Sequence, residues 1–460
     1  MLTRREFLIG ATGLASLSGC GRSRMRAASA LVNDVQSQLN ATRVNRIAPA
    51  HSVDDLRAAV KRAKVEGRSV SIAGGRHAMG GQQFGGDTIH VDTSALTRIL
   101  RFDREKGEIE VEAGMQWPQL IDHLWQVQAA EPRPWAIVQK QTGADRLSLG
   151  GALAANVHGR GLAFRPIIQD VEAFTLIDAD GEVHTCRRDR NAELFRLAIG
   201  GYGLFGLMGS VTLRLAPRRQ IERSVEVVDL GDALTALDSR IRAGFLYGDF
   251  QYATDATSDE FLRKGVFSCY LPTGDSSPMP ARQRELSDDD WRWLLYLSHA
   301  DKKRAFAQYA AYYLATTGQR YWSDTHQLSF YVDNYHEALD RQLGATERAT
   351  EMITEIYVPR NALPRFMEDV RAGFGEHRAS VIYGTIRLIE RDDESFLAWA
   401  RQPWACVIFN LHVVHTPEGI ERATRAFRLL IDIASALGGS YFLTYHRWAT
   451  RRQEIGRAHV

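Results

Sequence analysis

The chain has 460 residues, 45% hydrophobic and 24% charged, which is an ordinary globular composition, and its length allows roughly two to three domains. This composition excludes a disordered or fibrous protein, and a formal net charge of +2 without a basic stripe argues against a nucleic-acid-binding protein. The four cysteines form no disulfide framework and lack metal-ligand spacing, so we expect no metal, and no apolar run is long enough to cross a bilayer.

The first twenty residues have the features of a bacterial export signal. The arginine pair Arg4-Arg5 precedes an apolar stretch at 7–19, which ends at Cys20 in a sequence that resembles a lipobox. The stretch is too short for a spanning helix but suits a signal sequence; a short buried helix with a chance cysteine is the alternative. We expect a twin-arginine lipoprotein signal at 1–20 and a mature protein in the bacterial periplasm or on the outer face of the cell envelope, with a lipid anchor at Cys20. The twin-arginine route exports folded proteins, and a protein that must acquire a tightly bound cofactor in the cytoplasm needs such a route. The signal therefore also indicates a cofactor.

Neither end of the remaining chain resembles a domain. Residues 21–42 are basic and then polar, and we expect them to form a tether. Residues 454–460 match the translation of a common sequencing adapter, so we expect a non-native tail there and a natural C-terminus missing beyond about Gln453. An ordinary frayed terminus is the alternative.

Strands and helices alternate between residues 43 and 217. Leu56, Val60 and Ala63 share one face of a helix predicted over 53–66, and a second helix is predicted over 118–127 with Pro118 in its first turn. Asp180-Gly181 predicts a hairpin turn between strands at 171–178 and 182–186. Further short strands are predicted at 69–72, 88–91, 109–112 and 211–215.

Three glycine-rich stretches interrupt this region, at 73–86, 149–161 and 199–209. Glycine permits positive φ and close backbone approach, so that successive N–H groups can converge on an anion. A single run is commonly a turn, but three in one α/β region favour a diphosphate cofactor. Neither the Gly-x-Gly-x-x-Gly fingerprint nor the Walker pattern is cleanly present, which argues against a nicotinamide cofactor or a nucleoside triphosphate.

The order of these stretches resembles the FAD-binding domain of the vanillyl-alcohol oxidase superfamily, the type named after p-cresol methylhydroxylase (PCMH). The resemblance is carried by Gly-Gly-Arg-His-Ala-Met-Gly-Gly-Gln at 74–82, Leu-Gly-Gly-Ala-Leu-Ala-Ala-Asn-Val-His-Gly at 149–159 and Gly-Gly-Tyr-Gly-Leu-Phe-Gly at 200–206. It implies a PCMH-type FAD-binding domain at 43–217, whose first loop holds the FAD pyrophosphate. The implied cofactor-binding residues are Gly74, Gly75, Arg76, His77, Ala78, Met79, Gly80, Gly81, Gln82, Gly150, Gly151, Asn156, His158, Gly159, Gly200, Gly201 and Gly206.

His77 distinguishes between branches of this superfamily. The second stretch most resembles decaprenylphosphoryl-ribose oxidases, which have no histidine in the first loop. Alditol oxidases and cytokinin dehydrogenases have one there, and it carries FAD covalently through the 8α-methyl group. The resemblance therefore implies FAD bound covalently to His77, a bond that raises the reduction potential, and the alternative is a loop histidine hydrogen-bonded to backbone. The segment 142–148 lacks the cysteine of berberine-bridge-type relatives, and Asn156 is either a ribityl contact or, as we favour, a turn residue.

Residues 218–453 have a different character and form the predicted substrate or cap domain. Strands that bracket helices, without glycine-rich loops, predict an α+β domain that covers the flavin and that the missing C-terminus leaves truncated. The fold class is therefore α+β, a two-domain flavoprotein. Strands are predicted at 244–252, 266–271, 352–360, 381–388 and 406–414, and helices at 287–313, 364–373 and 420–437.

Polar residues on these strands are the candidate catalytic groups. Asn410 and His412 share a strand face, as do Thr385 and Arg387, because strand residues two apart point the same way. Alditol oxidases have Glu-Ile-Arg at the similar point, and both ionic residues bind substrate. The resemblance therefore implies that Arg387 is a catalytic residue, like the arginine of that segment. Thr385 stands in place of its glutamate and has no carboxylate, which Glu355 could supply instead.

Three further candidates come from the resemblance. The segment 441–448 resembles the last flavin-facing strand of cytokinin dehydrogenases and contributes Tyr445 and His446. Arg160 stands where alditol oxidases have a substrate-binding serine, which favours an anionic substrate over a simple polyol, and the alternative is a surface arginine. Each candidate alone is more often a satisfied polar residue of a sheet, but convergence from three strands favours a site.

The predicted function is an FAD-dependent oxidoreductase that oxidises a CH–OH group of a sugar-like, polyol or lactone substrate by hydride transfer to flavin N5. His412 or His446 is the candidate base, Arg387 orients the substrate or stabilises reduced flavin, and Arg160, Thr385, Asn410 and Tyr445 bind substrate. Oxygen or a membrane redox acceptor then takes the electrons. The alternatives are a non-enzymatic flavin-binding lipoprotein and an enzyme that acts on a lipid-linked sugar, against which the export signal argues.

Overall fold

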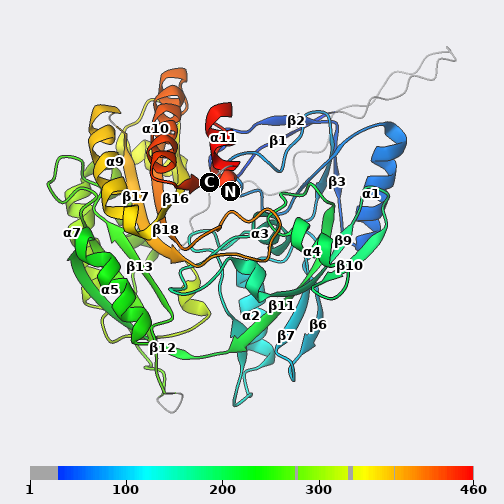
Figure 1. Cartoon of the computed structure of the whole chain (residues 1–460), viewed down its shortest axis with the longest axis horizontal. Coiled ribbons are helices and arrows are strands. Elements are labelled where there is room, and N and C mark those ends of the chain that lie inside the picture. The colour runs from blue at the N-terminus through cyan, green and yellow to red at the C-terminus, as the bar shows by residue number, and fades with distance from the viewer. Residues whose placement is uncertain (1–28, 275–277, 330–334, 378, 459–460) are drawn as a thin grey trace, which may run out of the picture.

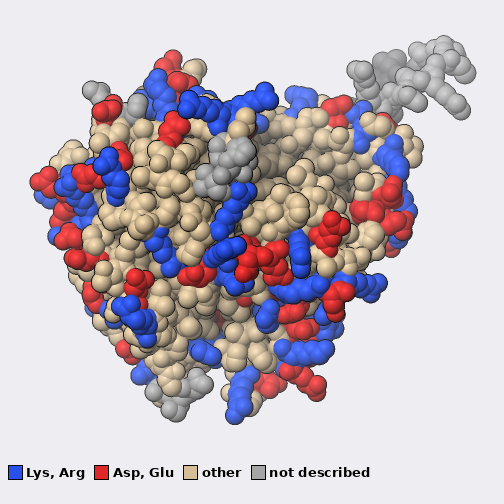
Figure 2. All heavy atoms as spheres, in the orientation of Figure 1, with Lys and Arg blue, Asp and Glu red and all other residues tan. Residues whose placement is uncertain are grey.

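The computed structural model describes residues 29–274, 278–329, 335–377 and 379–458, and these form the two lobes seen in Figure 1. The signal expected at 1–20, with its anchor at Cys20, lies outside the described residues. No helix in the described ranges has both the length and the apolar character needed to cross a membrane. On the face in Figure 2, acidic and basic side chains are interspersed, with large uncharged areas between them.

The first lobe begins with a small parallel sheet of order β3-β5-β4. Helix α1 (Val53–Glu66) packs on it through Leu56 and Val60, with the range that the apolar spacing predicts. Ser52 caps the start of α1 by accepting a hydrogen bond from the backbone of Asp55. The strands are β3 (Arg46–Pro49), β4 (Val70–Ala73) and β5 (Ile89–Asp92).

A six-stranded antiparallel sheet of order β10-β9-β11-β7-β6, with β8 beside β11, completes this lobe. The hairpin predicted around Gly181 is present, because β9 pairs with β10 across it. The strands are β6 (Ile99–Asp103), β7 (Glu108–Glu112), β8 (Trp135–Ile137), β9 (Val171–Ile177), β10 (Val183–Arg187) and β11 (Leu207–Pro217). The helices are α2 (Trp117–Val127), α3 (Leu149–Ala155) and α4 (Ala192–Ala198).

The tether expected at 21–42 is wrong for residues 30–42, which are folded against the protein. Strand β1 (Ala30–Val32) pairs with β2 (Thr42–Val44), and the Asn40 side chain donates a 2.5 Å hydrogen bond to the carbonyl of Met79. The Asp34 carboxylate accepts backbone N–H groups of the turn that follows it. In sequence these polar residues look like a linker, but in the structure their side chains pair with the backbone N–H groups of a tight turn.

The second lobe is an eight-stranded sheet of order β15-β12-β14-β13-β17-β18-β16-β19. Helices α5, α9 and α10 bury one of its faces, and Figure 1 shows α9 and α10 along β16 and β17. The strands are β12 (Gln220–Asp229), β13 (Tyr247–Tyr252), β14 (Lys264–Pro272), β15 (Arg320–Trp322), β16 (Ala349–Pro359), β17 (Val381–Ile389), β18 (Trp404–Val414) and β19 (Ser440–Tyr441). The helices are α5 (Leu230–Arg242), α6 (Asp288–Ala300), α7 (Lys302–Leu314), α8 (Tyr335–Leu343), α9 (Leu363–His377), α10 (Pro417–Ala436) and α11 (Arg451–Ala458).

Two predicted elements of this lobe are different in the structure. The helix expected at 287–313 is the pair α6 and α7, because Asp301 leaves the helical region and its side chain caps α7 at Arg304. The strand expected near 441–448 is only two residues long and is followed by a 3-10 turn at Leu443–Tyr445. Within the expected non-native tail, residues 454–458 continue α11, and Gln453 bonds the carbonyl of Arg428 on α10.

The loop at 390–403 connects the lobes by reaching from β17 across to α3 (Figure 1, orange). Asp392 accepts a 2.9 Å hydrogen bond from Asn156, and Trp399 donates one of 3.0 Å to the Asn156 carbonyl. Trp399 and Trp404 are buried in the core that α3 also enters. The two lobes therefore share apolar core as well as polar contacts.

Candidate active site

A cavity of about 570 Å³ lies where the two lobes meet. The first lobe contributes three segments to its wall, around residues 69–85, 141–158 and 202–208. The second lobe contributes Ile353 and Glu355 from β16, Arg387 from β17, and Phe442, Thr444 and Tyr445. The volume is within the range of about 300–1,000 Å³ typical of cofactor sites.

Glycines in the first loop permit the close packing that shapes this cavity. A Cβ added at Gly74 would lie 2.3 Å from Ser148 Oγ, and one at Gly75 would lie 2.4 Å from the carbonyl of Arg146. Arg76 has a φ of +55° and Gly81 one of +73°, so the chain turns sharply between them. The backbone N–H of Gly80 donates a 2.8 Å hydrogen bond to Thr444, which ties the loop to the second lobe.

The polar groups of this cavity fit a cofactor that supplies hydrogen-bond partners. Gln83 Oε1, Thr142 Oγ1 and Arg387 Nε all belong to residues lining the cavity, and each is buried without a hydrogen-bond partner in the described residues. Buried polar atoms are rarely left unpaired, so these three atoms indicate a bound polar molecule. A flavin dinucleotide offers both the acceptors and the donors that they require.

The structure separates the predicted cofactor-binding residues into two groups. Those that line the cavity are Gly74, Gly75, Arg76, His77, Ala78, Met79, Gln82, Gly150, Gly151, His158 and Gly206. Those that do not line it are Gly80, Gly81, Asn156, Gly159, Gly200 and Gly201. Gly159, in the second group, packs against the carbonyl of Lys140, which an added Cβ would meet at 2.6 Å.

Asn156 has the conformation and partners of a turn residue. Its φ is +49°, it ends α3, and its side chain bonds Asp392 and the backbone of Ile168. Both polar atoms of the amide are thereby used. These features are those of a turn residue, and a ribityl contact of Asn156 stays a prediction.

Glu355 is the centre of a buried polar cluster at the second-lobe wall. His158 Nε2 contacts Glu355 Oε1, and Tyr357 Oη donates a 2.6 Å hydrogen bond to the same oxygen. Burial raises the pKa of Glu355, but the charge of His158, hydrogen bonds from His158 and Tyr357, and the charge of Arg387 outweigh it and hold this pKa at about 2. Glu355 is therefore a carboxylate at neutral pH.

A proton must lie between His158 and Glu355. His158 Nδ1 is 2.9 Å from the carbonyl oxygen of Gly159, which can only accept, so Nδ1 carries a hydrogen. The neutral ring would then present a lone pair at Nε2 to the carboxylate. The close contact at Nε2 therefore requires one further proton, held between His158 and Glu355.

Arg387 and Tyr445 complete the cluster around Glu355. Arg387 is 4% exposed on β17, and its Nε has no hydrogen-bond partner in the described parts of the chain. Burial and the neighbouring Glu355 charge raise the pKa of Tyr445 well above its usual value, so its hydroxyl stays protonated. These placements put the predicted Arg387, Glu355 and Tyr445 at one wall of the cavity.

The two predicted base histidines, His412 and His446, do not line the cavity. His446 lies on the opposite, apolar face of the sheet beside Phe427, where burial lowers its pKa to about 3. It contacts Thr354, whose side chain points away from that of Glu355 because strand residues alternate. His412 shares the face of Glu355, but it contacts Glu351, four residues away along β16.

The predicted substrate residues Arg160 and Thr385 surround a carboxylate, Asp249, that sequence reasoning missed. Asp249 lies on β13, accepts a 3.4 Å hydrogen bond from Thr385 Oγ1 and is 4.0 Å from Arg160 Nη1. Arg160 is only 7% exposed, so the surface alternative is wrong, but neither Arg160 nor Thr385 lines the cavity. Asn410 also lies outside it, and its buried Oδ1 has no hydrogen-bond partner within the described ranges.

The sequence contains only weak indications of the site residues that were not predicted from it. The alternation Tyr247, Asp249, Gln251 marks a polar strand face, yet nothing local shows that this face meets Arg160. In the sequence, the 142–148 segment is notable only because it lacks a flavin-linking cysteine. In the structure, its residues Thr142, Gly143, Leu147 and Ser148 line the cavity. Tyr357 is recognisable only once β16 places it beside Glu355.

Comparison with known proteins identifies the cofactor domain. Residues 45–187 match the protein family described as FAD binding domain. The chain is 27% identical to L-gulonolactone oxidase of Bos taurus over 196 residues, 42% of each protein. It is 30% identical to cytokinin dehydrogenase 3 of Oryza sativa subsp. japonica over 158 residues (33% of this chain, 29% of the relative). With D-arabinono-1,4-lactone oxidase of Yarrowia lipolytica the identity is 25% over 181 residues, or 38% of this chain and 33% of the relative.

The matches concentrate on one part of each relative, since the chain spans less than half the length of the curated proteins that it matches. The family match covers the glycine loop of His77, the stretch of His158 and the strands between them. Together with the α+β two-lobed fold and the cavity, these findings confirm the expected cofactor and domain type: the chain carries a PCMH-type FAD-binding domain.

Proposed function

We propose that the whole protein is an FAD-dependent oxidoreductase that oxidises a CH–OH group of a lactone or related sugar-like substrate. The observation that carries the proposal is the buried cluster of Glu355, His158, Arg387 and Tyr445 at one wall of the FAD cavity. The relatives named as L-gulonolactone oxidase and D-arabinono-1,4-lactone oxidase support a lactone as the substrate. A non-enzymatic flavin carrier has no need for a proton-holding pair at this wall.

FAD supplies the oxidation, because its ring can accept a hydride from the carbon that carries the hydroxyl group. Glu355 lines the cavity as a carboxylate, so it can accept a hydrogen bond from the substrate hydroxyl and then its proton as the carbonyl forms. His158 holds its proton toward Glu355 Oε1 and keeps that oxygen in place. Glu355 thus takes the role of base in place of His412 and His446.

Arg387 provides a fixed positive charge at the same wall. Its guanidinium is buried, and its Nε has no hydrogen-bond partner among the residues that the structure describes. A buried cation of this kind stabilises negative charge that develops on bound substrate or cofactor during the transfer. Tyr445 keeps its hydroxyl hydrogen and can donate it to a substrate oxygen.

We also propose that His77 binds FAD covalently, since it lies in the cavity wall within the tight turn of the first loop. The purified protein denatured in acid should keep its flavin on the polypeptide, and His77→Ala should release it. His51→Ala, an exposed histidine outside the cavity, is the matched control. Release of all the flavin from the unsubstituted protein would refute the covalent bond but not FAD binding.

The activity is tested by anaerobic mixing of the yellow protein with a panel of aldonolactones and polyols. A substrate bleaches the visible flavin band, and Glu355→Gln should slow bleaching by about 100-fold or more at unchanged FAD content. Glu112→Gln, a buried glutamate bonded to Arg98 outside the cavity, is the control and should keep the rate per bound FAD. Full bleaching rates in Glu355→Gln would remove Glu355 from the reaction.

The electron acceptor and location are proposed from the sequence. A protein exported by Arg4-Arg5 and anchored at Cys20 would meet oxygen or a membrane-bound acceptor at the cell envelope. Cys20→Ala should then shift the protein from the membrane fraction to the soluble periplasmic fraction. Equal membrane association of both forms would contradict the lipid anchor.

A further inference from the structure

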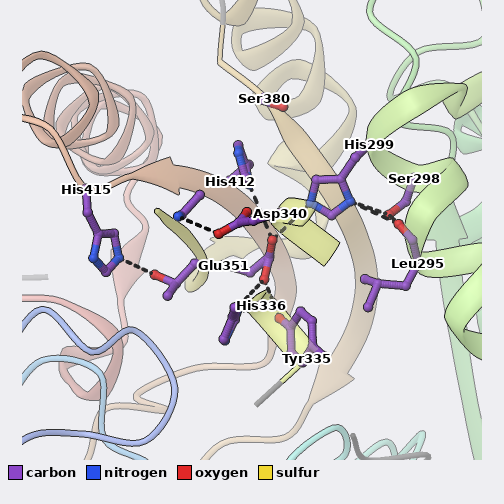
Figure 3. A network of polar contacts seen from close by, with 12 residues as sticks. Leu295, Ser298, His299, Tyr335, His336, Asp340, Glu351, Ser380, His412 and His415 are labelled. Atoms are coloured by element: carbon purple, nitrogen blue, oxygen red, sulfur yellow. Dashed lines mark hydrogen bonds and ion pairs between the residues drawn. The ribbon is translucent and has the colours of Figure 1, made fainter. Parts of the chain in front are cut away.

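Four residues of the second lobe form a second cluster, centred on the buried carboxylate of Glu351 (Figure 3). His299 Nε2 lies 2.9 Å and His412 Nδ1 3.3 Å from Glu351 Oε1, while His336 Nδ1 lies 3.1 Å from Oε2. The histidines come from α6, β18 and α8, and Glu351 from β16. Glu351 and Glu355 are four residues apart on β16, or about 13 Å along a strand, so this cluster is separate from the FAD cavity.

The hydrogen bonds of His299 require a proton or a metal ion between its ring and Glu351. His299 Nδ1 is 2.9 Å from the carbonyl oxygen of Leu295, which only accepts, so this nitrogen carries a hydrogen. The neutral ring therefore points a lone pair from Nε2 at a carboxylate oxygen 2.9 Å away. Two lone pairs repel at this distance unless a proton or a metal ion lies between them.

The bond to Leu295 also has the form expected at a metal site. Histidine ligands of metals usually donate their other ring N–H to a backbone carbonyl, which fixes the tautomer and the ring orientation. His336 adds a further nitrogen beside the cluster, because its Nδ1 lies 3.1 Å from Glu351 Oε2, the oxygen that also accepts a hydrogen bond from Tyr335 Oη.

We propose that His299 Nε2, His412 Nδ1 and a Glu351 oxygen bind a divalent cation of the zinc class, with His336 beside them as a further ligand. The three ligand atoms lie within 4.8 Å of one another. Nitrogen and carboxylate ligands at about 2.0–2.2 Å suit Zn²⁺, and a set of three protein ligands leaves a fourth position for water. This proposal replaces the expectation, drawn from the cysteine spacing, that the protein holds no metal.

The burial of the ligands permits such an ion to enter and to stay. The Glu351 and His299 side chains are 1% and 5% exposed, whereas His412 is 22% exposed and leaves an opening to solvent. The ion would join α6 to the paired strands β16 and β18, in which Glu351 and His412 stand directly opposite. Its role is therefore to fix the helix against the sheet rather than to act on substrate.

The test measures metal directly and does not depend on activity. The full-length flavoprotein, expressed with added Zn²⁺ and purified in metal-free buffer, should contain about one zinc per chain by elemental analysis. A chelator-treated sample should bind Zn²⁺ with one-to-one stoichiometry, and its melting temperature should rise when Zn²⁺ is returned, as binding to the folded state requires.

Substitutions locate the site. His299→Ala and His412→Ala should each reduce bound zinc at least tenfold, while His415→Ala should retain it, because His415 contacts Thr350 and not Glu351. The FAD absorbance of each variant shows that the protein is folded. If the unsubstituted protein holds its FAD but neither contains nor binds Zn²⁺ at micromolar concentration, then a proton fills the cluster and the proposal is wrong.

Discussion

Gly74 gives the sharpest test of how the first loop is shaped. Its position lets the backbone approach Ser148, since an added Cβ would lie 2.3 Å from Ser148 Oγ and 2.6 Å from Ser148 Cβ. Both residues line the FAD cavity. Contacts below 3 Å force the backbone or the neighbour to move, so Gly74→Ala must displace either the first loop or the 142–148 segment.

The expected cost follows from the size of the clash. Overpacking by one methyl group costs about 1–3 kcal/mol, which corresponds to a loss of roughly 2–12 °C in melting temperature at about 2–4 °C per kcal/mol. The loop that moves also holds the cofactor, so FAD content should fall in parallel. The assay is differential scanning fluorimetry together with the flavin-to-protein absorbance ratio of the purified variant.

Two further variants make the result specific. Gly86→Ala is the control, because this exposed glycine in the same loop has no atom within 4 Å of its added Cβ. Ser148→Gly combined with Gly74→Ala removes both close contacts and should restore most of the melting temperature and the FAD. The reasoning is refuted if Gly74→Ala behaves like Gly86→Ala, or if Ser148→Gly gives no recovery.

Two other substitutions test the corrected placements. His446 has a pKa of about 3 because it is buried, and about 6.5 when the chain is unfolded. Between these values the unfolded chain binds a proton that the folded protein does not, so folding stability rises with pH and is lost as pH falls below 6.5. His446→Phe should remove this loss, about 2 kcal/mol between pH 6.5 and 5, in urea unfolding measured at both pH values; an unchanged pH slope would contradict the burial. Asn156→Gly keeps the positive φ but removes the bonds to Asp392 and Ile168, and should lower stability by about 1–3 kcal/mol while bound FAD per folded chain stays constant. Loss of FAD without loss of stability would restore Asn156 as a cofactor contact.

Local patterns predicted the parts of this fold that local physics determines. The apolar spacing of 53–66 is enough to define α1, since Leu56 and Val60 fall on one helical face that must be buried. The glycine loops were identifiable for the same reason, because their function depends on backbone conformation at consecutive positions. The break between α6 and α7 was missed because Asp301 is an ordinary helix-surface residue until its side chain caps Arg304.

The catalytic residues were harder to predict, since they depend on strand register. Period-two alternation correctly paired Thr385 with Arg387, but it does not show which face of a strand meets the cofactor. His446 looked catalytic beside Tyr445, yet the 3-10 turn at Leu443–Tyr445 sends the two side chains to opposite sides of the sheet. Asp249 and Arg160 meet across 89 positions of sequence, and only the tertiary fold brings them together.

One strand face links the cofactor site to the proposed cation site. Glu351, Ile353, Glu355 and Tyr357 alternate along β16 toward the same side, and Ile353 and Glu355 line the cavity. β16 pairs without a register shift with β18 over its whole length, so both sites are built on one continuous ladder. The His299 and His412 contacts lie at one end of the hydrogen-bond ladder that places Glu355 at the other. The geometry of the proton-accepting carboxylate therefore depends on the sheet as a unit, and not on the residues of the cavity alone.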